Sequence, residues 1–162
     1  MEKTSLLTIK GLKIEGRSGD AWHEIVKGVD LTLHKGEVLG LIGESGAGKS
    51  TLGLAAMGFA RDGCRISGGT IDFDGIDLRT AAETLRRGLR GKRIAYVAQS
   101  AAASFNPAHK LIDQYCEAPV VHGVMPRKKA EDDAVELYRR MRLPNPDEIG
   151  FRYPHQVSGG QL

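Results

Sequence analysis

Apolar and polar residues alternate along the first part of the chain, a pattern typical of half-buried β-strands. Residues 6–14 predict a first strand that a glycine interrupts, and residues 16–20 predict a loop. Residues 22–33 predict a second and a third strand, because apolar side chains at 29, 31 and 33 alternate with polar ones. The chain is therefore expected to open with short strands.

Continuous apolar runs predict two further strands, at 38–42 and at 94–98, the second of which ends on Gln99. Residues 70–73 predict another strand, and the following Asp74-Gly75 is typical of a hairpin turn. Asp72, Asp74 and Asp77 also suggest a calcium loop, but Ile76 and Asp77 break the order of an EF-hand, which favours the hairpin.

Helical patterns occupy most of the remaining chain. The first follows Lys49 and ends by Gly58, the second covers 82–90, and the third covers 111–121 with a break or kink expected at Pro119. A clearer helix begins at Pro126 and ends before 144–146, and residues 100–107 predict a loop. One face of the helix after Pro126 is expected to pack in a core; it carries Ala130, Ala134, Leu137, Tyr138 and Met141.

The basic residues near the second helix allow two interpretations. Arg86, Arg87, Arg90, Lys92 and Arg93 are close in the sequence and suggest a phosphate-binding patch. Such runs more often form a solvated face, which is the interpretation we favour.

The most informative segment is Gly43-Glu44-Ser45-Gly46-Ala47-Gly48-Lys49-Ser50, which has the form G-x-x-x-x-G-K-[ST] between a predicted strand and a predicted helix. Its glycines allow backbone N–H groups to approach phosphate oxygens without intervening side chains. The helix start adds partial positive charge, Lys49 would reach the β- and γ-phosphates, and the Ser50 hydroxyl would bind Mg²⁺. An accidental glycine-rich turn is the alternative, and the sequence context favours nucleotide binding.

Composition and charge exclude some classes of function but do not identify one. The 162 residues are 41% hydrophobic and 27% charged, which fits one domain or a large part of one. A net charge of +3 is too small to indicate nucleic-acid binding. Cys64 and Cys116 predict free thiols, and the histidines lack metal-ligand spacing. Without a signal-peptide core or a long apolar run, a soluble intracellular protein is expected, one that can still dock on a membrane protein.

Two later segments narrow the choice among phosphate-loop proteins. Ser158-Gly159-Gly160-Gln161 resembles the signature motif of the ABC-type ATPases, in which Leu is usual at the position of Val157. Gln99 resembles the glutamine of that family's Q-loop. The three motifs follow the family's order and spacing, so the resemblance extends over essentially the whole chain.

Finer features resemble the oligopeptide, dipeptide and nickel importer ATPases. They are the phosphate loop itself, Ser104-Phe105-Asn106-Pro107 and Tyr153-Pro154-His155-Gln156. The segment Ser100-Ala101-Ala102-Ala103 replaces an acidic, Met-containing continuation that is usual after the Q-loop, which leaves the substrate group open.

The resemblance implies an α/β fold, namely a P-loop NTPase core with an N-terminal antiparallel β subdomain, over about 1–99, and part of a helical subdomain, over about 100–162. It implies ATP and Mg²⁺ as cofactors. The backbone of 43–49 with the hydroxyls of Ser50 and Thr51 would hold the triphosphate and the metal. Lys49 and Gln99 would be catalytic, and Gln99 would reach the Mg²⁺ and the attacking water.

The resemblance also implies partners. Ser158, Gly159, Gly160 and Gln161 would close over ATP bound to a second ATPase subunit, identical or paralogous, and 100–123 would face transmembrane permease subunits. A solute-binding protein would act indirectly, and the location would be the cytoplasmic face of the membrane. Trp22 is the candidate for stacking on adenine, and a surface-anchored core tryptophan is the alternative.

Several family motifs are missing from this sequence. The Mg²⁺-coordinating Asp and catalytic Glu (Walker B), the D-loop and the switch His all follow the signature in the family. We therefore expect the 162 residues to be the N-terminal portion of one ATPase domain that binds nucleotide poorly and hydrolyses little alone.

The leading functional hypothesis is the ATP-binding subunit of an importer for peptides or nickel. A soluble ABC ATPase of translation or DNA repair is the first alternative, and nothing in the sequence indicates the long insert that such proteins often carry. A nucleotide-binding module without catalysis is the second alternative. A P-loop kinase would leave Gln99 and the signature without a role.

Overall fold

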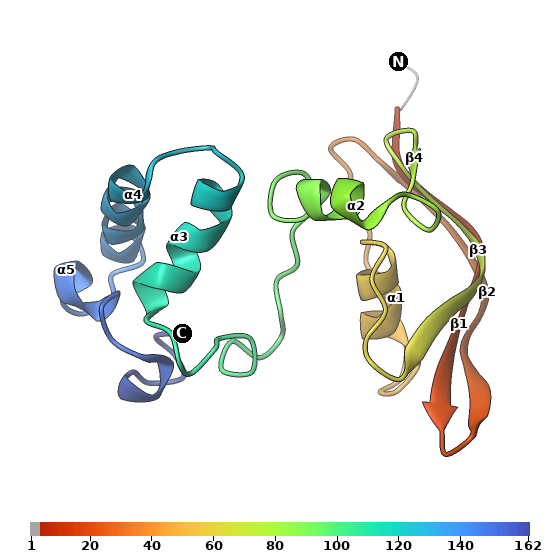
Figure 1. Cartoon of the computed structure of the whole chain (residues 1–162). Coiled ribbons are helices and arrows are strands. Elements are labelled where there is room, and N and C mark those ends of the chain that lie inside the picture. The colour runs from red at the N-terminus through yellow and green to blue at the C-terminus, as the bar shows by residue number, and fades with distance from the viewer. Residues whose placement is uncertain (1–3) are drawn as a thin grey trace. The chain divides into compact units, whose positions relative to one another are not determined.

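A computed structural model describes residues 4–162, which form two compact units that divide between Arg90 and Gly91 (Figure 1). Residues 1–3 lie outside the described part, so the expectation about the signal peptide falls partly outside it. Among residues 4–162, every helix is too short or too polar to cross a bilayer.

The first unit is built on an antiparallel sheet with strand order β2-β1-β3-β4 (Figure 1). The central strand β1 (Ser5–Ser18) pairs with β2 (Ala21–His34) on one side and with β3 (Cys64–Phe73) on the other. The short β4 (Ile76–Asp77) completes the sheet next to β3. These pairings confirm the antiparallel β subdomain.

The hairpin of β1 and β2 is longer than the sequence indicates. The loop expected at 16–20 is a short turn, because pairing continues to Ser18 and Ala21 and Gly19 turns the chain at φ 62°. The second and third strands expected at 22–33 are one continuous strand. The pairing register between β1 and β2 shifts beside Leu12, where the nearby Gly11 and Gly28 have positive φ. The chain therefore has a bulge within one hairpin here, and not a turn between separate strands.

The turn between β3 and β4 confirms the predicted hairpin. Asp74 and Gly75 have φ values of 51° and 84°, the left-handed pair that a two-residue hairpin turn requires. The carboxylate of Asp72 accepts a hydrogen bond from the Gly75 N–H at 3.2 Å. The carboxylate of Asp77 accepts one from the Arg79 N–H at 3.0 Å. Asp72 and Asp77 thus fasten the local backbone.

Helices α1 (Lys49–Ala55) and α2 (Glu83–Leu89) lie on the same side of this sheet (Figure 1). Their apolar side chains and those of the strands form the buried core of the unit. Its members are Ile9, Leu12, Ile14, Val26, Leu52, Leu54, Ala55, Ile71, Phe73, Leu78 and Leu89. The core therefore fixes α1, whose first residue belongs to the G-x-x-x-x-G-K-[ST] motif, against the strands.

The strands predicted at 38–42 and 94–98 are not formed. The first run has no regular secondary structure, and Ile94 alone of the second has an isolated bridge. Val38, Ile42 and Val97 are 95%, 100% and 92% exposed. The physical reason is pairing: a strand is stabilised by a hydrogen-bonded neighbour, and within residues 4–162 the sheet contains no strand that pairs with either run.

The second unit is helical. It contains α3 (Leu111–Val121), α4 (Arg127–Arg140), the short α5 (Pro146–Ile149) and a 3₁₀ turn η1 (Pro154–Gln156). Its core joins α3 to α4 and consists of Ile112, Cys116, Ala130 and Ala134, with Tyr115, Met125 and Tyr138 packed against them.

Two helix predictions need correction. Helix α3 is not broken at Pro119 and continues to Val121, with Pro119 near its C-terminal end. Its carbonyl accepts a hydrogen bond from the Val124 N–H at 2.8 Å, which closes the end of the helix. Met141, expected in the α4 stripe, is 60% exposed because α4 ends at Arg140. The end before 144–146 is confirmed.

Candidate functional site

The loop before α1 is shaped by glycines in the left-handed region. Gly46 and Gly48 have φ values of 85° and 81°, and Gly48 is also the residue that precedes the first turn of α1. A Cβ atom at Gly48 would lie 3.3 Å from the Cγ2 atoms of both Ile25 and Val26 on β2. Glycine at 48 is therefore required both by the backbone conformation and by the close approach of the strand.

Lys49 closes this loop from the helix side. Its ammonium group donates hydrogen bonds to the carbonyl oxygens of Gly43 at 2.7 Å and Glu44 at 2.5 Å. The Ala47 N–H donates to the Glu44 carbonyl at 3.2 Å, so the loop also contains a turn of its own. The arrangement holds one cation at the loop through two carbonyl oxygens, directly before the first turn of α1.

The first turn of α1 carries hydroxyls and no carboxylate, since Lys49 is followed by Ser50, Thr51 and Leu52. Ser50 is exposed and Thr51 is half-buried, whereas Leu52 is buried against the strands. The positive charge of Lys49 is thus not offset by an acidic residue in this turn. The Ser50 hydroxyl is the hard oxygen ligand that Mg²⁺ prefers.

Trp22 lies near the start of β2, opposite Arg17 in the ladder with β1. The Arg65 guanidinium covers one face of its ring, 4.2 Å from the ring centroid, and also forms an ion pair with Glu15 at 2.7 Å. The residue is 38% exposed, so it lies at the surface of the sheet. Ile25, three residues further along β2, contacts the phosphate loop.

Gln99 belongs to the second unit and is exposed. The loop that follows it is fastened to α3 by Gln114, a residue that the sequence analysis did not select. The Gln114 side chain accepts from the Asn106 N–H at 2.8 Å and donates to the carbonyls of Asn106 and His109, each at 3.0 Å. A glutamine inside a helical pattern gives no sequence signal for this role.

The signature segment is an exposed turn. The backbone N–H of Ser158 donates to the side-chain oxygen of Gln161 at 2.8 Å, and the Gln161 N–H donates back to the Ser158 carbonyl at 2.9 Å. Residues 159–161 are a turn. The bond from the Ser158 N–H to the Gln161 side chain is one of the two bonds of a capping box, and Ser158, Gly159 and Gly160 are exposed.

The preceding segment repeats this arrangement. The Tyr153 N–H donates to the side-chain oxygen of Gln156 at 2.9 Å, across η1. Both glutamines therefore act as acceptors for a backbone N–H three residues earlier. Phe105, Gln114 and Gln161 line one pocket of about 470 Å³ in the same unit. The signature segment therefore lies close to the loop after Gln99.

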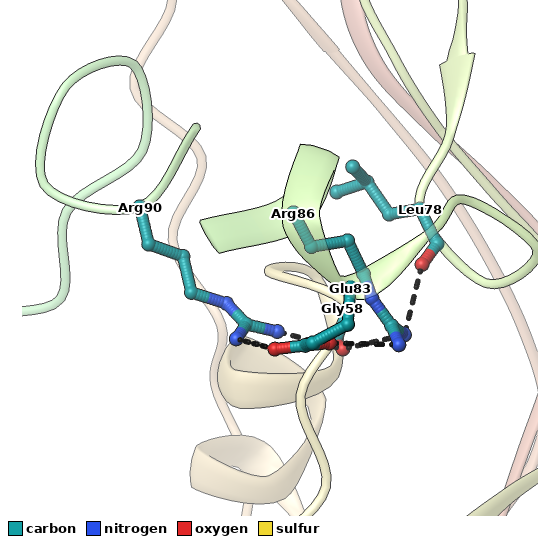
Figure 2. A network of polar contacts seen from close by, with 5 residues as sticks. All are labelled: Gly58, Leu78, Glu83, Arg86 and Arg90. Atoms are coloured by element: carbon teal, nitrogen blue, oxygen red, sulfur yellow. Dashed lines mark hydrogen bonds and ion pairs between the residues drawn. The ribbon is translucent and has the colours of Figure 1, made fainter. Parts of the chain in front are cut away.

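The basic stretch at 82–93 is only partly a solvated face. Arg87 is exposed, but the side chains of Arg86 and Arg90 are only 24% and 25% exposed. Figure 2 shows both guanidinium groups directed at the carbonyl oxygen of Gly58. The prediction of a solvated face is wrong for these two arginines, because backbone carbonyls and Glu83 supply the partners that allow them to be partly buried.

The helical unit holds its charges in local pairs. Arg127 binds Glu131 at 2.7 Å and Asp113 at 2.5 Å, and these contacts raise the pKa of its guanidinium. Burial raises the pKa of the Cys116 thiol, which keeps it protonated. Both cysteines are free, as expected.

Comparison with known protein families decides the class. The model of a family described as "ABC transporter" matches residues 26–162. The chain belongs to the ABC transporter family. The phosphate loop, Gln99 and the signature segment all lie inside the matched range.

Curated relatives of this ABC transporter chain are ATP-binding proteins of import systems. It is 31% identical over 160 residues to the oligopeptide transport ATP-binding protein OppD of Lactococcus lactis subsp. cremoris, covering 99% of this chain and 47% of OppD. It is 36% identical over 160 residues to the metal-staphylopine import system ATP-binding protein CntD of Staphylococcus aureus, covering 98% of this chain and 57% of CntD. The chain thus spans about half the length of the curated relatives that it matches.

A solved structure supports the fold. The dimeric ATP-binding cassette MJ0796 bound to ADP and Pi matches with a TM-score of 0.79 at 21% identity, over 96% of this chain and 65% of that one. The α/β fold of an ABC cassette, expected from the sequence, is confirmed.

Proposed function

We propose that this chain is the nucleotide-binding part of the energy-coupling subunit of an ABC importer, in which ATP binding and hydrolysis drive solute uptake. The observation that carries the proposal is the position of the Lys49 ammonium over the carbonyls of Gly43 and Glu44, at the entrance of α1. Phosphate oxygens of ATP would take over these hydrogen bonds.

The residues present fit MgATP. The left-handed Gly46 and Gly48 keep side chains away from the phosphate path, and the hydroxyls of Ser50 and Thr51 follow at once on the helix. Mg²⁺ commonly uses few protein ligands and completes its shell with phosphate oxygens and water. Bound Mg²⁺ would neutralise charge on the β- and γ-phosphates. Within the first unit, Ser50 would be its protein ligand, and Lys49 would hold the phosphates in place.

Trp22 would contact the adenine. A strand rises about 3.3 Å per residue, so Trp22 lies about 10 Å along β2 from Ile25, which contacts Gly48 of the phosphate loop. That separation suits a base held beyond a triphosphate. The ring face not covered by Arg65 would stack on the base.

Exposed Ser158, Gly159 and Gly160 support a role in a partner's site. They would contact ATP bound to a second ATPase subunit, while Gln99 with the segment 100–123 would report the nucleotide state to transmembrane permease subunits. In this role the protein would act at the cytoplasmic face of a membrane. The names of the relatives favour peptides or a metal complex as the solute. The sequence resemblance adds nickel as a candidate, and a solute-binding protein would deliver the solute.

ATP turnover by the full-length natural protein tests this proposal, with Lys49→Ala and Ser158→Arg beside the wild type. We expect both substitutions to abolish turnover and only Lys49→Ala to weaken ATP binding strongly, because Lys49 holds the nucleotide of its own subunit. Turnover that survives Ser158→Arg would make the signature an ordinary turn and would indicate a monomeric P-loop enzyme.

A further inference from the structure

Helix α1 ends in a cluster of polar contacts that lies away from the phosphate loop. The Gly58 carbonyl accepts hydrogen bonds from Arg86 at 3.3 Å and from Arg90 at 3.2 Å (Figure 2). Arg86 also donates to the Leu78 carbonyl at 3.4 Å. Arg86 of α2 and Arg90, the residue that follows α2, thus bind the chain three residues beyond the end of α1.

Glu83 supplies the counter-charge for both arginines. Its carboxylate binds Arg86 at 2.8 Å and Arg90 at 2.9 Å, so the three side chains form one network. The Arg90 guanidinium also lies 5.7 Å from the ring centroid of Phe59, the residue after Gly58. A guanidinium suits this site because its planar fork donates to a carboxylate and a carbonyl at once.

The backbone at the end of α1 leaves little freedom. Gly58 has a φ of 65°, and a Cβ atom there would lie 2.9 Å from the Leu78 carbonyl oxygen. The N–H groups of Met57 and Gly58 donate back to Leu54 and Ala55, so the turn continues the helix rigidly. A force on the Gly58 carbonyl is therefore transmitted to α1.

Helix α1 connects this cluster to the phosphate loop. Its seven residues span about 10 Å, and Leu52, Leu54 and Ala55 are buried against the strands. A short buried helix moves as one body, so its tilt is fixed by what holds its two ends. Lys49 and Ser50 are at one end, and the arginine cluster holds the other.

We propose that Arg90, together with Arg86, is a positioning residue of the nucleotide site that acts through α1 by binding the Gly58 carbonyl. The inference rests on the proposed function and adds to it residues outside the phosphate-binding motif that affect nucleotide binding. When the hydrogen bonds from these arginines to the Gly58 carbonyl are lost, α1 tilts, and the loop before it binds triphosphate less well.

The test uses the full-length natural protein with Arg90→Gln, Arg90→Lys and Glu83→Gln, and Arg87→Gln as the matched control. Arg87 belongs to the same helix and carries the same charge, but it is exposed. Three quantities are measured: the Kd for MgATP by fluorescent-nucleotide titration, the KM and kcat of turnover, and the Tm with and without MgATP.

We expect Arg90→Gln to raise the Kd and KM for MgATP about tenfold, as loss of a charged hydrogen bond does, with a smaller change in kcat. The rise in Tm caused by MgATP should shrink. Arg90→Lys should restore affinity to within about threefold of wild type, since an ammonium can still donate to the Gly58 carbonyl. Arg87→Gln should match the wild type throughout.

A lower Tm with unchanged Kd and unchanged MgATP stabilisation would mean a structural role only and would overturn the inference. If Arg90→Gln does not fold, Glu83→Gln decides, because it keeps both arginines and removes their counter-charge. A wild-type protein that binds no nucleotide would overturn the proposed function and this inference with it. Wild-type binding that Arg90→Gln and Glu83→Gln leave intact would overturn the inference alone.

Discussion

The side-chain oxygen of Gln161 accepts the backbone N–H of Ser158 at 2.8 Å, so the last residue of the signature motif holds the first. This contact fixes the turn that presents Gly159 and Gly160 to solvent. A glutamine at this position thus has a structural role in shaping the segment, separate from any contact with a ligand. The same contact joins Gln156 to Tyr153 one segment earlier.

Replacement of Gln161 tests its structural role in the turn. Gln161→Glu keeps an acceptor oxygen for the Ser158 N–H, whereas Gln161→Leu removes it. We expect the Ser158 amide to exchange with solvent about fivefold faster in Gln161→Leu, since a hydrogen bond of about 1 kcal/mol is lost, and to be nearly unchanged in Gln161→Glu. Amide hydrogen exchange followed by NMR measures this. Equal exchange in both variants would show that the side chain does not hold the turn in solution.

Two glycines near the phosphate loop should respond in opposite ways to alanine. Gly48 has a φ of 81° and a crowded Cβ position, so Gly48→Ala should lower the free energy of unfolding by about 1–2 kcal/mol and weaken ATP binding. Gly53 lies inside α1 with open space around its Cβ position, so Gly53→Ala should raise the free energy of unfolding by about 1 kcal/mol. Urea unfolding with and without MgATP measures both. A stabilised Gly48→Ala protein would contradict the left-handed conformation.

Local patterns predicted the positions of the helices and of the hairpin between β3 and β4, because the signals for them lie within short segments. The Asp74-Gly75 turn is an example, since both residues tolerate a positive φ. The strands at 38–42 and 94–98 were predicted from apolar runs, and they did not form because a strand depends on a distant neighbour that no local pattern describes.

In the candidate site, too, residues with a local sequence signal were predicted, whereas residues that act through tertiary contacts were not. The phosphate loop follows from a motif whose residue types carry the chemistry, and the sequence identified Lys49 and Ser50 directly. Arg90 and Gln114 bind backbone carbonyls of residues far from them in the sequence, or in an irregular loop. Such contacts depend on tertiary placement, so local patterns do not indicate that either residue binds these carbonyls.

Asp77 should make the stability of the first unit depend on acid pH. Burial alone would raise the pKa of its carboxyl, but hydrogen bonds from the Arg79 N–H and the Thr80 hydroxyl outweigh burial and hold the pKa below its ordinary value of 3.8. Because the folded pKa is the lower one, this contribution to stability is present above pH 3.8 and is lost as the pH falls through the folded value.

The variant Asp77→Asn tests that dependence. It keeps one acceptor oxygen but loses the charge, so we expect it to be about 1 kcal/mol less stable than the wild type at pH 7. The difference should shrink steadily below pH 4, where the wild-type carboxyl takes up its proton. Urea unfolding across this range measures it, with Asp20→Asn at the exposed tip of the β1–β2 hairpin as the control. A difference that stays constant with pH would assign the effect to shape rather than charge.

Trp22 provides a test that separates binding of the base from binding of the phosphates. If its ring stacks on adenine, Trp22→Ala should weaken ATP binding about tenfold, since stacking of an aromatic ring on a base contributes about 1–3 kcal/mol. Trp22→Phe should lose much less, because it keeps a ring. Inorganic tripolyphosphate with Mg²⁺ lacks the base, so its affinity should be the same in all three proteins. Competition against a fluorescent ATP analogue measures each affinity in the full-length protein, and Arg65→Gln shows whether the cation on the other ring face matters. Equal losses for ATP and tripolyphosphate would mean that Trp22 supports the hairpin of β1 and β2, and that another residue contacts the base.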